Sequence, residues 1–216
     1  ETGVADKRKL IGAGILAGLA FLTRETAVFV AVYFGLLFLA GHRIGRWNYL
    51  WIAAGFVAVW ALELVYLGIM TGDPLYRFNI ALHHDSTIDR SIDLAGNVIV
   101  HPLVDPLLVL LLNQEFMALM LFALPLGAWL CLSRAIPPRL RHFARQIALL
   151  GGCWFVCVGA AQHLLPLNPR YFMITASMAC LLAGTALGWL WQQGSPRTRR
   201  AALGGLALLA GTNLVG

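Results

Sequence analysis

Long apolar runs alternate with short polar and charged segments along the whole chain. The apolar runs cover residues 10–41, 47–70, 102–132, 147–165, 171–191 and 201–216. An α-helix of about 20 apolar residues is long enough to cross a bilayer, whereas a half-buried strand would show strict alternation of apolar and polar positions. The pattern therefore predicts an all-α, polytopic helical membrane protein.

The first apolar run is too long to be a single membrane helix. Residues 10–41 would form a helix of roughly 48 Å, against a hydrocarbon core of about 30 Å. The run also carries two opposite charges, Arg24 and Glu25, near its middle. We therefore expect two short helices, over residues 10–22 and 27–41, joined as a hairpin whose tip carries these two charges.

The run over residues 102–132 divides in a similar way. Prolines near its start favour a short helix over about 102–112 that lies on the membrane interface. Asn113 can then cap a spanning helix over about 115–132, with Glu115 in its first turn.

Composition and charge place these helices in a membrane. The chain is 59% hydrophobic and only 12% charged, whereas a soluble domain carries about 25% charged residues. Most of the 16 Lys and Arg residues fall into four clusters, which are Lys7–Lys9; Arg43 and Arg46; Arg134, Arg139, Arg141 and Arg145; and Arg197, Arg199 and Arg200. Basic clusters in short loops mark the cytoplasmic side, so an even number of crossings must separate them.

The predicted helices satisfy this condition at every cluster. We expect about seven membrane helices in the plasma (inner) membrane, the first two forming the short hairpin. An external loop over residues 71–101 precedes the external interfacial helix. The sequence starts without methionine and ends inside an apolar run, so we expect one transmembrane domain over residues 1–216 that belongs to a longer chain.

This topology gathers the isolated polar residues at the external, periplasmic face. Arg24 and Glu25 lie at the hairpin tip, where two interpretations remain open. In the first, Arg24 forms a structural ion pair with Glu25 or with Glu63. In the second, Arg24 faces a cavity and binds an anion such as phosphate.

Two further segments at this face carry candidate chemistry. Arg170 begins a helix, where backbone amides favour an anion, while the adjacent Tyr171 suits either that cavity or an interfacial anchor. His83 and His84 in the external loop are candidates for hydrogen bonding to a substrate or for a solvated loop. Neighbouring side chains point about 100° apart on a helix, so a shared metal is disfavoured. We expect no metal, no cofactor and no nucleic acid.

Three motifs together resemble a known enzyme family. The segment GILAGLAFLTRE over residues 14–25 is similar to the G-xxx-GLA-xLT-[KR] segment of polyprenyl-phosphate-sugar-dependent integral-membrane glycosyltransferases of the type C fold. Residues 169–171, PRY, resemble a later segment of the same family, and residues 72–77, GDPLYR, resemble a loop of its bacterial members. The nearest branch includes protein O-mannosyltransferases and the lipid A aminoarabinose transferase.

The resemblance implies a function at the external face. The donor would be a polyprenyl-phosphate-linked sugar, the acceptor a glycan, lipid or protein, and the membrane lipid a further partner. Arg24, with Glu25 beside it, would face the donor phosphate, and Arg170 and Tyr171 would line the same cavity, with the histidine loop nearby. The family's catalytic acid lies in an upstream external loop that this sequence lacks, so no catalytic residue is assigned. The alternative is a transporter or flippase for a lipid-linked or anionic solute, which would also use cations in a cavity.

Overall fold

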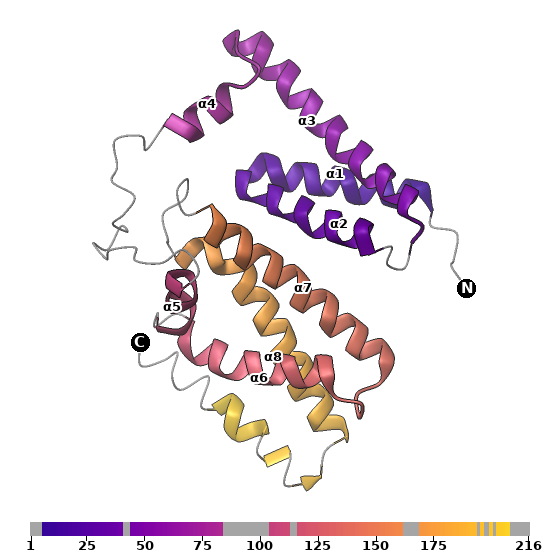
Figure 1. Cartoon of the computed structure of the whole chain (residues 1–216), viewed down its shortest axis with the longest axis vertical. Coiled ribbons are helices and arrows are strands. Elements are labelled where there is room, and N and C mark those ends of the chain that lie inside the picture. The colour runs from indigo at the N-terminus through magenta and orange to yellow at the C-terminus, as the bar shows by residue number, and fades with distance from the viewer. Residues whose placement is uncertain are drawn as a thin grey trace. The chain divides into compact units, whose positions relative to one another are not determined.

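The computed structural model describes most of the chain and shows only helices within that part (Figure 1). The described residues are 6–40, 44–83, 104–112, 116–161, 169–193, 195–196, 199–200 and 202–207. They separate into two compact units, residues 1–89 and residues 90–216.

The described residues of the first unit form four α-helices, the last of them short. The unit's elements are α1 (Lys7–Thr23), the 3-10 helix η1 (Glu25–Val28), α2 (Phe29–Ala40), the 3-10 helix η2 (Arg46–Asn48), α3 (Tyr49–Thr71) and α4 (Tyr76–His83). The break predicted within the first apolar run is confirmed, because Arg24 is extended, with φ −156° and ψ 126°. Its backbone N–H donates to the Ala20 carbonyl and ends α1.

Helices α1 and α3 run in the same direction and touch through glycines. Gly14 lies against the backbone of Ile52, and one turn further on Gly18 lies against the side chain of Val59. Helix α2, which lies between α1 and α3 in the sequence, runs in the opposite direction to both (Figure 1). This order of directions agrees with the predicted hairpin followed by an outward helix.

The start of the predicted external loop is more ordered than the sequence suggested. Gly72 ends α3 with a φ of +75°, a conformation that glycine adopts readily. Asp73 then accepts the Leu75 N–H at 2.9 Å and the Asn79 side-chain amide at 2.7 Å, which favours the start of α4. The rest of that loop, residues 84–101, lies outside the described residues.

Within its described residues, the second unit contains four longer helices and a short helical stretch over residues 202–207. The longer helices are α5 (Val104–Leu112), α6 (Met117–Leu132), α7 (Pro138–Ala160) and α8 (Met173–Gln193), and the 3-10 helix η3 (Pro169–Phe172) leads into α8. Helix α5 coincides with the short helix predicted over about 102–112. The predicted cap at Asn113 and the acid at Glu115 lie outside the described residues.

Helix α7 begins nine residues before the predicted span over 147–165. The basic residues Arg139, Arg141 and Arg145 are therefore part of a helix and not of a loop. Pro138 starts this helix, as proline does well in a first helical turn. The Arg145 Nε donates to the Cys131 carbonyl at 2.9 Å, and the Arg141 guanidinium donates to the Ser133 carbonyl at 3.3 Å. These bonds satisfy carbonyls at the end of α6 and draw the basic residues into a helix.

Side chains from three helices form the core of the second unit. Leu130, Ile147, Leu182 and Ala186 are buried together, and the rings of Trp129 and Trp189 meet edge to face with centroids 5.4 Å apart. Helix α7 lies against α6 and α8. The unit is thus held by interlocking side chains.

Three helical segments in the described part of the chain are long and apolar enough to cross a membrane: Arg46–Thr71, Pro138–Ala160 and Pro169–Gln193. Two shorter apolar helices accompany them, over Thr26–Ala40 and Leu119–Leu132. The chain therefore has the composition and helix lengths of a multi-pass membrane protein.

Candidate functional site

The end of α1 carries the first candidate group. Arg24 is exposed and directly follows Thr23, the last residue of the helix. The Thr23 hydroxyl and the Arg24 N–H both donate to the Ala20 carbonyl, at 2.6 Å and 3.1 Å. The backbone that presents Arg24 is therefore tied to the helix end, while Thr26, just beyond it, is buried.

Glu63 is paired with Arg77, which answers one of the questions that the sequence left open. The Arg77 Nη1 donates to Glu63 Oε1 at 2.7 Å. The side chains are only 17% and 11% exposed, respectively. The same guanidinium donates through Nη2 to the Phe21 carbonyl at 2.8 Å. Glu63, considered above as a partner of Arg24, therefore forms its ion pair with the arginine of α4.

Sequence reasoning missed this pair because the two residues stand fourteen positions apart, on opposite sides of a turn. The signals were present. Glu63 is an acid inside a spanning run, and Gly72 and Asp73 mark a chain reversal that returns Arg77 towards α3.

The second unit presents Arg170 and Tyr171 in η3. The Arg170 guanidinium donates to the Tyr171 hydroxyl at 3.2 Å, and its carbon lies 5.0 Å from the centre of the Tyr171 ring. The Tyr171 carbonyl in turn accepts the Trp154 indole N–H at 2.8 Å. This bond fixes η3 to α7, so the arginine and tyrosine stand at a defined end of the unit.

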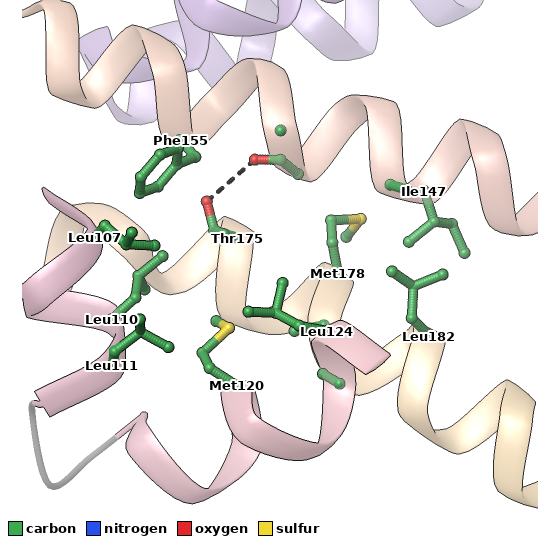
Figure 2. Close-up of a pocket in the computed structure, with 15 residues that line it drawn as sticks. Leu107, Leu110, Leu111, Met120, Leu124, Ile147, Phe155, Thr175, Met178 and Leu182 are labelled. Atoms are coloured by element: carbon green, nitrogen blue, oxygen red, sulfur yellow. Dashed lines mark hydrogen bonds between the residues drawn. The ribbon is translucent and has the colours of Figure 1, made fainter. Parts of the chain in front are cut away.

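An apolar pocket of about 250 Å³ lies between the four helices of the second unit (Figure 2). Leucines of α5 form one wall, Met120 and Leu124 of α6 another, and α7 and α8 the rest. The hydroxyl of Thr175 donates to the Gly151 carbonyl at 3.3 Å, as the dashed line in Figure 2 marks. The pocket is thus suited to hydrocarbon.

The pocket begins close to η3. Phe172 is fully buried and its ring stands 6.0 Å from that of Phe155, which lines the pocket. Thr175, also in the lining, follows Arg170 by five residues. The exposed Arg170 and the apolar pocket therefore belong to the same unit.

The predicted site residues fall into both units. Arg170 and Tyr171 are in contact with each other, whereas Arg24 belongs to the first unit, so a common cavity stays a prediction. The side chains of Glu25 and His83, and the whole of His84, lie outside the described residues. Within the described part, no three His, Cys, Asp or Glu side chains gather as a metal site would require.

Compared with known proteins, the chain matches no protein-family model, no curated protein and no solved structure. The class that the fold defines is a multi-pass α-helical membrane protein. The resemblance to type C glycosyltransferases rests on the sequence motifs.

Proposed function

We propose that the chain is part of a membrane glycosyltransferase. It moves a sugar from a polyprenyl-phosphate donor to a glycan, lipid or protein acceptor at the external face of the plasma membrane. This chain contributes about seven membrane helices and part of the cavity around the donor phosphate, while the catalytic acid belongs to an upstream segment.

One observation carries the proposal: the unit that presents Arg170 also holds an apolar pocket, whose lining includes Thr175, five residues after Arg170. A polyprenyl phosphate joins an anion to a long hydrocarbon, so its two parts match these two features. Guanidinium groups bind phosphate by charge-assisted, often bidentate hydrogen bonds. The pocket lining offers hydrocarbon contacts from Leu107, Leu110 and Phe155.

Arg24 is the cation of the proposal that lies in the first unit. Negative charge develops on the phosphate as the sugar leaves, and a preorganised cation stabilises that charge more than it stabilises the bound donor. Arg24 sits at the tied end of a helix, which limits the reorganisation needed during the reaction.

Sugar transfer by the full-length protein in proteoliposomes tests the proposal. We expect Arg24→Ala to lower turnover with a polyprenyl-phosphate sugar by about 100-fold, as removal of one charge-stabilising donor does in other enzymes. Arg24→Lys keeps the charge and retains partial activity. Arg46→Ala is the matched control, because Arg46 lies at the opposite end of the unit. Unchanged turnover in Arg24→Ala, with normal protein levels, would contradict the proposal.

The same proteoliposomes test the alternative of a transporter or flippase. A donor labelled on its sugar reports both transfer to acceptor and movement across the bilayer. Movement of intact donor without any transfer would favour the transporter and overturn the glycosyltransferase.

A further inference from the structure

A single guanidinium group links three helices of the first unit. Arg77 of α4 donates to Glu63 of α3 at 2.7 Å and to the Phe21 carbonyl of α1 at 2.8 Å. Its guanidinium carbon also lies 5.2 Å from the centre of the Phe21 ring, as in a cation–π contact. The side chain thereby joins the start of the external segment to the end of α1.

The Phe21 carbonyl is one of those that a helix cannot satisfy by itself. The last four carbonyls of an α-helix lack an amide of the following turn. In α1, the Ala20 carbonyl accepts from Arg24 and Thr23, and the Phe21 carbonyl accepts from Arg77. Arg77 therefore acts as a cap, supplied from another helix, three residues before Arg24.

Glu63 fixes the guanidinium in this place. Its Oε1 accepts from Arg77, and its Oε2 is buried without a hydrogen-bond partner among the residues that the structure describes. A buried carboxylate strongly favours a nearby cation. Arg77 is held by this charge, and its planar fork directs the second N–H at the carbonyl of Phe21.

We propose that Arg77 is a positioning residue for the donor site: it fixes the last turn of α1 and, through it, the backbone of Arg24. This inference rests on the proposed function, because it assigns Arg77 a part in binding the donor phosphate through Arg24. Arg77 itself contacts no substrate.

Two variants of the full-length protein separate positioning from folding. Arg77→Ala alone would leave Glu63, whose side chain is only 11% exposed, without its cation, which lowers the amount of folded protein. The paired variant Glu63→Leu with Arg77→Met removes both charges and keeps apolar bulk, a replacement that proteins often tolerate well. It also removes the hydrogen bond to the Phe21 carbonyl. Arg77→Lys is the second variant, because it keeps the charge beside Glu63 and loses the planar fork.

We expect the paired variant to keep the thermal midpoint of the wild type and to raise the KM for the donor about tenfold, since small misplacements of a binding group are costly. The KM for the acceptor should not change. Arg77→Lys should give a smaller rise in donor KM. Arg46→Ala is again the matched control, because Arg46 also donates to a helix-terminal carbonyl, that of Leu39 at 3.1 Å, yet lies away from Arg24. A wild-type donor KM in both Arg77 variants would overturn the inference.

The route through Arg24 is tested by combining the substitutions. If Arg77 acts only through Arg24, the paired substitutions should raise the donor KM no further in an Arg24→Ala background. A further tenfold rise there would overturn the route. If Arg24→Ala alone leaves donor KM and turnover unchanged, the proposed function fails; if Arg24→Ala raises donor KM and the Arg77 variants do not, only the positioning role fails.

Discussion

The two units pack their apolar helices in different ways. In the first, α1 and α3 approach until their backbones touch: a Cβ added at Gly14 would stand 2.9 Å from the Ile52 carbonyl carbon, and one at Gly55 would stand 2.9 Å from the Ile15 amide nitrogen. In the second, the glycine contacts are with side chains, as at Gly151, where a Cβ would stand 3.0 Å from the Met178 Cβ.

This difference has a physical basis in the membrane. Lipid tails are as apolar as leucine, so helices associate through close van der Waals contact and hydrogen bonds, with little hydrophobic driving force. Close glycine packing gives the α1–α3 pair a single geometry. Both units contain apolar pockets, one of about 350 Å³ lined by α1, α2 and α3 and one of about 250 Å³ lined by α5 to α8. Under the proposed function, the α1–α3 pair holds Arg24 and the pocket of the second unit receives hydrocarbon.

The largest effect should come from adding a side chain at the α1–α3 contact. Gly14→Val should abolish the native packing of the first unit, because the obstructing atoms belong to the Ile52 backbone and cannot rotate away. The yield of monodisperse protein in detergent and its thermal midpoint measure the effect. Gly12→Val in the same helix is the matched control, since a Cβ at Gly12 meets nothing within 4 Å. Equal stability of the two variants would show that the glycine contact does not hold the unit together.

Much of this helical framework could be predicted from the sequence. The break at Arg24 followed from helix length and from two charges in an apolar run, and the bounds of α3 and α8 lie within a few residues of the predicted spans. These features depend on local apolar length, which sequence reports directly.

The features that were missed depend on contacts distant in sequence. The early start of α7 reflects Arg145 bonding back to the end of α6. The pairing of Glu63 with Arg77 needs the turn at Gly72, and the pocket needs four helices brought together. Spacing along the chain predicts the residues at each helix end but does not specify their partners.

A smaller effect is expected from the same kind of substitution in the second unit. Gly151→Ala brings a Cβ to 3.0 Å from the Met178 Cβ, a contact that a shift of a few tenths of an ångström between α7 and α8 relieves. We expect a loss of about 1 kcal/mol of unfolding free energy, at the low end of overpacking effects. Unfolding in mixed detergent measures it. Gly152→Ala, where nothing lies within 4 Å, should be neutral or slightly stabilising. A collapse of Gly151→Ala comparable to Gly14→Val would remove the distinction between the units.

The smallest effect should come from the hydrogen bond that crosses the pocket wall. Thr175→Val removes the bond from its hydroxyl to the Gly151 carbonyl, which is long at 3.3 Å, and keeps the branched shape of the side chain. Hydrogen bonds between membrane helices contribute about 0.6 kcal/mol on average, so we expect a loss of that order in the same unfolding measurement. Because valine adds only hydrocarbon to an apolar lining, binding of a polyprenyl phosphate should persist. A loss of unfolding free energy several times larger would mean that this hydrogen bond holds α7 and α8 together more than their side-chain packing does. The two units would then differ in hydrogen bonding, and not in how their glycines pack.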